Sequence, residues 1–202
     1  MATYLMRKEF SYGLKGGTLM KFNIFLKSIL VICLSIIVLS NPKLSANENV
    51  QKTGDLLQLI LPSYAAGITI IYEDGQGALQ LTKAFGVTMA ITYGLKYSLN
   101  VERPYEGGGG YSFPSGHTSS SFSAAEFIRM RYGWGYGAPA YILATFVGYS
   151  RIESHQHRGY EVIAGAAIGV LSSFIFTKPY HGWHINIEGD TKSIGLNFSR
   201  SF

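Results

Sequence analysis

The chain has 202 residues, which suits a single domain with a substantial hydrophobic core. Hydrophobic residues make up 47% of the sequence and charged residues only 14%, a balance that excludes a disordered chain and indicates contact with a membrane. The formal net charge of +5 arises in residues 1–46, which hold six of the 17 Lys and Arg residues but only one of the 12 acidic residues. The rest of the chain, called the body below, is therefore neutral. We predict no nucleic-acid partner.

Residues 1–46 have the layout of an export signal. Basic residues precede a short apolar run at 29–39, and a polar segment follows it up to Ala46. Two outcomes stay open: cleavage after Ala46, or retention of the run as a membrane anchor, although the run is shorter than the ~20 residues that span a bilayer. The run holds Cys33, the only cysteine, so an internal disulfide and a cysteine zinc site are excluded.

The body contains several stretches with the length and pattern of helices. Apolar residues occur on all sides of four of them, at 56–72, 78–99, 138–149 and 162–177, which is typical of a bundle core or of membrane segments. A fifth, at 118–132, has a polar side that includes Glu126 and Arg131, and we expect this side to face water. We also expect a polar linker at 47–54 and a break at 133–139. The fold class is therefore all-α, a compact helical bundle.

The segments around these helices show two further patterns. Four glycines at 107–110 lie in the loop 105–113, and no Gly-Lys-Ser/Thr sequence follows them, so this loop is no phosphate-binding P-loop. Near the C-terminus, apolar residues at 185, 187, 194, 196 and 198 alternate with other residues on either side of Gly189 and Asp190. This alternation predicts a short β-hairpin in the tail, residues 181–202.

Polar side chains gather at the ends of three expected helices. They are Lys96 and Arg103, then Ser115, Gly116 and His117, then Arg151, His157 and Glu161. Helix ends on one side of a bundle converge, so we expect one pocket that collects three cations, two histidines and a carboxylate. Arginine offers bidentate donors, lysine a point charge, and a helix N-terminus unpaired N–H groups, so phosphate is the anion that fits this pocket best.

This set of side chains matches the needs of phosphoryl transfer, which are charge stabilisation, a nucleophile and a proton donor for the leaving oxygen. Two histidines supply the last two roles near neutral pH. Glu161 follows His157 by four residues at the start of a helix, where its carboxylate is able to hold the ring through the nitrogen that does not attack.

Three motifs in this order resemble the type 2 phosphatidic acid phosphatase (PAP2) family, which is related to bacterial acid phosphatases and vanadium haloperoxidases. The motifs are Lys96 with Arg103 and Pro104, then Pro114-Ser115-Gly116-His117, then Ser150 and Arg151 with His157 and Glu161. The resemblance extends over residues 54–178. It implies a bundle of five to six helices and a metal-independent phosphohistidine mechanism without a cofactor.

The resemblance also implies a role for each matching residue. The groups that would bind phosphate oxygens are Lys96, Arg103, Arg151, Ser115 and the N–H of Gly116. His157 would be the nucleophile and His117 the general acid. The family has Asp at the position of Glu161, so one extra methylene must be accommodated there, and Glu153 is the alternative orienting carboxylate.

Three other interpretations stay open. The histidines at 155, 157, 181 and 184 would be ligands of a metal site, although no acidic cluster accompanies them. A vanadate-dependent haloperoxidase would use the same pocket with bound vanadate. A non-catalytic envelope protein would carry a decayed site, for which the Glu161 departure is the only support.

We therefore predict an N-terminal extension with signal peptide or anchor at 1–46, a phosphatase domain at 47–180 and the tail at 181–202. The enzyme would hydrolyse a phosphomonoester or pyrophosphate of a lipid, or a small phosphoester, with neither metal nor cofactor. We expect it in the bacterial cell envelope, periplasmic or in the inner membrane, with the active site facing the periplasm.

Overall fold

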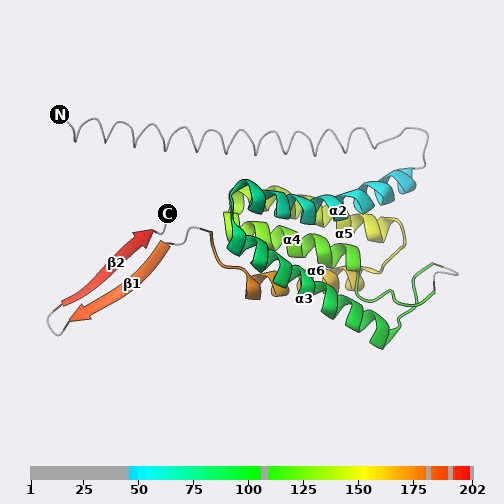
Figure 1. Ribbon diagram of the computed structural model, residues 1–202. Helices are drawn as coiled ribbons and strands as arrows, with labels where there is room; N and C mark the ends of the chain where they lie inside the picture. Colours follow the sequence, from blue (N-terminus) through cyan, green and yellow to red (C-terminus); the bar gives the residue numbers. More distant parts are fainter. Residues whose placement is uncertain (1–45, 106–108, 181–182, 191–192, 201–202) are drawn as a thin grey trace. The chain divides into compact units, whose positions relative to one another are not determined.

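The computed structural model describes residues 46–105, 109–180, 183–190 and 193–200 (Figure 1). This part of the chain forms the helices α2 (Ala46–Ile71), α3 (Gly75–Leu99), α4 (Gly116–Tyr132), α5 (Trp134–Glu153) and α6 (Gly159–Phe176). The prediction of an all-α bundle is confirmed. Two strands follow in the chain, β1 (Trp183–Asp190) and β2 (Ser193–Arg200), which pair antiparallel with Ile187 opposite Leu196.

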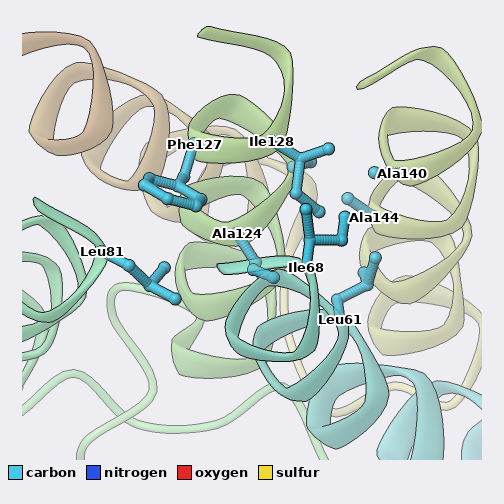
Figure 2. Close-up of a cluster of buried hydrophobic side chains, with 10 residues drawn as sticks. Leu61, Ile68, Leu81, Ala124, Phe127, Ile128, Ala140 and Ala144 are labelled. Carbon is cyan, nitrogen blue, oxygen red and sulfur yellow. The ribbon is translucent and has the colours of Figure 1, made fainter. Parts of the chain in front are cut away.

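Helix α4 is the centre of the bundle, since it packs against α3, α5 and α6. Figure 2 shows the buried hydrophobic cluster to which α2, α3, α4 and α5 contribute. Its residues are Leu61, Ala65, Ile68, Leu81, Ala124, Ala125, Phe127, Ile128, Ala140 and Ala144. The alanines of α4 and α5 let these two helices lie close together, and the larger side chains fill the remaining space.

The polar side of α4 is buried, so the expectation that it faces water was wrong. Glu126 is 1% exposed and Arg131 is 8% exposed. Glu126 accepts hydrogen bonds from Arg129 and from the hydroxyl of Tyr141, while Arg131 forms an ion pair with Asp74, the N-cap residue of α3. Charges are buried only where such partners satisfy them, and two of these partners, Tyr141 and Asp74, lie outside α4.

Helix α6 approaches the start of α4 closely because two of its glycines face α4. A Cβ atom at Gly165 would lie 2.5 Å from the carbonyl oxygen of Ser115, and one at Gly169 would meet the carbonyl oxygen of Ser119. The N–H of Ser115 donates to the carbonyl oxygen of Glu161 at 3.0 Å. These contacts fix the start of α6 against the start of α4, where the second and third motifs lie.

Two helices are longer than predicted. Helix α2 includes the segment 47–54, which we expected to be a linker, and α5 includes most of the segment 133–139, which we expected to be a break. In α2, packing outweighs the low helix propensity of glycine, because Gly54 lies directly against Ser150 of α5. In α5, Pro139 lies inside the helix beyond its first turn, and burial of Ala140 and Ala144 in the core offsets the hydrogen bond that proline cannot donate.

Two of the described helices are long and apolar enough to cross a membrane, over Glu48–Ile71 and Gly159–Phe176, judged by length and composition. Large apolar side chains on α5 and α6 are exposed, among them Ile142, Ile163 and Ile175 at 70–71%. An apolar surface of this kind is a candidate for contact with lipid.

Candidate active site

A cavity of about 480 Å³ lies where the end of α3, the start of α4 and the segment after α5 meet. It is lined by Gln58, Met89, Tyr93, Lys96, Tyr97, Arg103, Tyr111, Gly116, His117, Arg151, Gln156 and His157. Six of the eight residues singled out from the sequence belong to this lining. The other two, Ser115 and Glu161, are fully buried beside it.

Two cations come from the end of α3 and the loop that follows. Lys96 lies in the last turn of α3, and its Nζ donates to the carbonyl oxygens of Tyr111 and Ser112 at 2.7 and 3.3 Å. Arg103 donates through Nη1 to the side-chain oxygen of Gln156 at 3.2 Å. Burial, and secondly the charge of Arg103, lowers the pKa of Lys96 to about 8. An anion in the cavity would raise this pKa again, because it favours the charged ammonium.

The start of α4 forms one wall of the cavity. Ser115 is the N-cap residue, and its Oγ accepts a hydrogen bond from the N–H of Thr118 at 3.4 Å and bonds the hydroxyl of Thr118 at 2.9 Å. The side chain of Ser115 thus serves the helix start, whereas Gly116 and His117 line the cavity. The first N–H groups of a helix have no partner within the helix and suit an anion placed there.

Arg151, in the last turn of α5, is 2% exposed and held by three acceptors. Its Nη1 donates to Oδ1 of Asp55 at 2.6 Å, its Nη2 to the carbonyl oxygen of Gln51 at 2.8 Å, and its Nε to Oγ of Ser150 at 3.1 Å. The guanidinium therefore has a fixed position at the wall of the cavity.

His157 and Glu161 form a buried pair. Nδ1 of His157 lies 2.9 Å from Oε2 of Glu161, and the two side chains are 3% and 0% exposed. The same carboxylate oxygen accepts hydrogen bonds from the hydroxyl of Ser112 at 2.5 Å and from the N–H of Arg158 at 3.1 Å. Because Nδ1 faces Glu161, Nε2 is the ring nitrogen that is left for a substrate.

The two histidines have pKa values below the ordinary range. Burial lowers the pKa of His157 to about 4, although Glu161 acts in the opposite direction. Burial and the charge of Arg151 lower the pKa of His117, while Asp55 raises it. His157 is therefore neutral near pH 7, which is the form that a nucleophilic imidazole needs.

Sequence reasoning missed an aromatic wall beside the cations. The rings of Tyr93 and Tyr97 stack with centroids 6.4 Å apart, and Tyr97 meets Tyr111 edge to face at 5.2 Å. All three tyrosines line the cavity. On α3, large side chains recur every four residues beside Lys96, at Met89, Tyr93 and Tyr97. This spacing indicates that they lie on the same face of the helix.

Sequence reasoning also missed Asp55 and Ser112, which contact predicted site residues. Asp55 follows the segment that we expected to be a linker, and Ser112 lies in the loop after the glycine run. Neither has a distinctive sequence neighbourhood, so only the packing of α2 against α5 and the course of the loop reveal them.

The alternative residues named from the sequence lie elsewhere. Glu153 is exposed on α5, and the carboxylate that contacts His157 is that of Glu161. Of the histidines considered for a metal, the side chains of His181 and His184 lie outside the described residues. Within the residues described, no group of three or more His, Cys, Asp or Glu side chains is arranged to hold a metal ion.

Comparison with known proteins identifies the family. The family model of the PAP2 superfamily matches residues 26–184, a segment that contains all three motifs and the helices α2 to α6. The chain belongs to the PAP2 superfamily. The resemblance stated from the three motifs is therefore confirmed.

Relatives of this PAP2 protein include two lipid A phosphatases. A lipid A 4'-phosphatase of Helicobacter pylori strain J99 is 29% identical over 140 residues, which cover 64% of this chain and 70% of that protein. A lipid A 1-phosphatase of Porphyromonas gingivalis is 37% identical over 143 residues, which cover 61% of this chain and only 31% of that protein. The crystal structure of Aquifex aeolicus LpxE shares the fold, with a TM-score of 0.54 at 20% identity over 71% of this chain and 92% of that one.

These matches confirm that the PAP2 protein is a phosphatase built on a helical bundle. Strands β1 and β2 pair in the structure, but none of the matches supports a hairpin as part of this fold, and the predicted hairpin stays a prediction. The domain boundaries at 46 and 180 also stay predictions.

Proposed function

We propose that this PAP2 protein hydrolyses a phosphate ester or pyrophosphate of a lipid through a phosphohistidine at His157, with no metal ion in the reaction. The observation that carries the proposal is the setting of His157. Its Nδ1 contacts the buried carboxylate of Glu161 at 2.9 Å, and its ring lines a cavity that also holds Lys96, Arg103 and Arg151. A neutral imidazole held in this way is a nucleophile beside an anion site.

In the first step, Nε2 of His157 attacks phosphorus while the bond from phosphorus to the leaving oxygen breaks. Glu161 accepts the hydrogen bond from Nδ1 and stabilises the positive charge that develops on the ring. A bound phosphate anion favours the protonated form of His117, which gives its proton to the leaving oxygen. An ester thus releases its lipid as a neutral alcohol, and a pyrophosphate releases a lipid monophosphate. The phosphoryl group is then bonded to His157.

In the second step, water attacks the phosphoryl group. His117 is neutral after the first step and accepts a proton from this water. The bond between phosphorus and Nε2 breaks, which restores the neutral ring of His157 and releases inorganic phosphate. His117 is again protonated, so both histidines are ready for the next substrate.

Three cations supply the charge stabilisation that a metal ion supplies in other phosphatases. Lys96, Arg103 and Arg151 line one cavity, together with Gly116 and His117, the first two residues of α4. Fixed donors of this kind neutralise the equatorial oxygens of the transition state without rearranging during the reaction. The reaction therefore needs neither Mg²⁺ nor Zn²⁺ for this task.

The lipid part of the proposal rests on the aromatic wall and on the relatives. Tyr93, Tyr97 and Tyr111 give the cavity an apolar side next to its cations, which suits an amphipathic substrate. Both relatives described above are lipid A phosphatases, so a phosphorylated glycolipid is the first substrate class to test. The apolar helices α2 and α6 favour association with the inner membrane, and export through residues 1–46 would place the site on the periplasmic side.

The test is phosphate release from a panel of lipids, namely lipid A, phosphatidic acid and a polyprenyl pyrophosphate, followed by thin-layer chromatography. We expect turnover of at least one lipid, unchanged by a chelator, and a loss of ~10³-fold or more in His157→Ala. The matched control is His155→Asn, because His155 is exposed two residues away and Asn tolerates its positive φ of 55°. His157→Ala activity within tenfold of wild type, or a requirement for added Mg²⁺ or Zn²⁺, contradicts the proposal.

A further inference from the structure

Asp55, a residue of α2 outside the three motifs, joins two of the predicted site residues. Its Oδ1 accepts a hydrogen bond from Nη1 of Arg151 at 2.6 Å and lies 3.1 Å from Nε2 of His117. The contact brings together α2, α4 and α5 at the wall of the cavity. The carboxylate of Asp55 thus lies between Arg151, a proposed phosphate-binding cation, and His117, the proposed general acid.

The packing of α2 against α5 fixes the position of Asp55. A Cβ atom at Gly54 would lie 2.7 Å from Nη2 of Arg151 and would overlap the hydroxyl of Ser150, so only glycine lets α2 come this close to α5. One turn earlier, the carbonyl oxygen of Gln51 accepts a hydrogen bond from the same Nη2 at 2.8 Å. These contacts of Gly54 and Gln51 hold the part of α2 just before Asp55 against α5, with Oδ1 of Asp55 3.1 Å from Nε2 of His117.

We propose that Asp55 is the positioning residue of the general acid: it holds the proton on Nε2 of His117 until the leaving oxygen takes the place of the carboxylate. This inference rests on the proposed function, in which His117 protonates the leaving group. It gives each histidine its own carboxylate, Glu161 for the nucleophile and Asp55 for the acid.

The surroundings of the two carboxylates suit these different tasks. The side chain of Glu161 is 0% exposed and accepts hydrogen bonds from Ser112 and from the N–H of Arg158, so it stays in place. The side chain of Asp55 is 44% exposed, so it is able to turn toward water when a phosphate ester enters. The nucleophile needs a permanent partner, whereas the acid needs one that makes room for the substrate.

The chemical step balances without another reactant. The proton on Nε2 of His117 moves to the leaving oxygen as the bond from that oxygen to phosphorus breaks, and the new bond joins phosphorus to Nε2 of His157. Asp55 gives and takes no proton. After the step, His117 is neutral and serves as the base for water, as described above.

The charges that face His117 determine the effect of removing Asp55. The charged groups are the guanidiniums of Arg151 and Arg103, the ammonium of Lys96 and the carboxylate of Asp55, and the ring of His157 is a further, neutral titratable group beside them. Arg151 and Lys96 lower the pKa of His117, and Asp55 raises it. Without the carboxylate the pKa of His117 falls further, so the alkaline limb of the activity profile, where the acid loses its proton, moves to lower pH.

The test compares Asp55→Asn on two substrates that differ in the need for an acid. A lipid phosphate releases an alkoxide and needs protonation, whereas 2,4-dinitrophenyl phosphate releases a stable phenolate and does not. We expect kcat to fall by ~10–100-fold on the lipid phosphate and by less than ~3-fold on the aryl phosphate, because general-acid catalysis is worth 10²–10⁴-fold only where the leaving group needs it. Asp55→Glu should recover part of the loss, and the alkaline limb of Asp55→Asn should lie at lower pH.

The matched control is Glu48→Gln, which removes one charge from an exposed position on the same helix. Equal losses of kcat on both substrates, or no loss on either, overturn the inference. His157→Ala separates this failure from failure of the proposed function, since it must be inactive on both substrates if the phosphohistidine mechanism holds. Melting temperatures verify folding, and Asp55→Ser carries the same comparison if Asp55→Asn does not fold.

Discussion

His157 differs from an ordinary buried histidine in the partners of its two ring nitrogens. Nδ1 faces a carboxylate that is itself held by Ser112 and by a backbone N–H, while the ring borders a cavity lined with cations. Burial lowers its pKa to about 4, and Glu161 limits this effect. In the proposed mechanism the ring is therefore neutral before the reaction and carries a positive charge only while it is bonded to phosphorus, which is when Glu161 would stabilise it most.

We expect the negative charge of Glu161 to be essential for turnover, whereas the length of its side chain is not. Glu161→Gln keeps the shape of the side chain but removes the charge that stabilises the imidazolium and fixes the tautomer. We expect kcat to fall by ~10²–10⁴-fold, as it does when the carboxylate of a catalytic triad is changed. Glu161→Asp should retain activity.

The matched control for this prediction is Glu153→Gln, which changes an exposed carboxylate eight residues earlier. The turnover of all three variants is measured as phosphate release from a lipid phosphate. Near wild-type turnover in Glu161→Gln together with inactivity in Glu153→Gln would transfer the orienting role to Glu153.

Among the helices, the apolar pattern predicted each segment but not where it begins. The segments at 56–72 and 138–149 were recognised, yet α2 and α5 extend about ten and four residues further toward the N-terminus. Local sequence rules treat glycine, proline and polar residues there as breaks. Contacts between helices reverse that preference at Gly54, and such contacts are not visible in a single sequence.

The contact of α6 with the start of α4 is expected to control the geometry of the site. Gly165→Ala places a methyl group 2.5 Å from the carbonyl oxygen of Ser115, so the two helices must separate. Because the N–H of Ser115 bonds the carbonyl oxygen of Glu161, separation displaces the second motif relative to the third. We expect turnover to fall by ~10²-fold, the scale of a 1 Å displacement at a reacting centre, and the melting temperature to fall as well.

Gly86→Ala in α3 is the matched control for this prediction, since apart from the adjacent backbone of α3 nothing lies within 4 Å of the new methyl group. It should leave turnover unchanged and leave the melting temperature equal or higher, because alanine favours helix over glycine. Wild-type turnover in Gly165→Ala would show that the helix contact does not control the site.

For the whole molecule, the sequence allowed most of the candidate site to be predicted because its residues lie at helix ends with fixed spacing. Six of the eight predicted residues line one cavity, and Glu161 lies directly beside His157. Asp55 could not be predicted as a site residue, since it reaches the cavity through the packing of α2 against α5. The tyrosines of α3 were missed although their spacing beside Lys96 indicates a shared helix face. The buried polar side of α4 was wrongly assigned to water for the same reason.

The central claim, a phosphoryl group bonded to His157, is tested most directly by trapping it. Purified protein is mixed with a lipid carrying ³²P in its phosphate, quenched in base after a fraction of one turnover, digested and mapped. The account predicts label on the peptide that contains His157, stable in base and lost in acid, and no label in His157→Ala. Turnover that proceeds without label on this peptide, or label that survives acid, would contradict it.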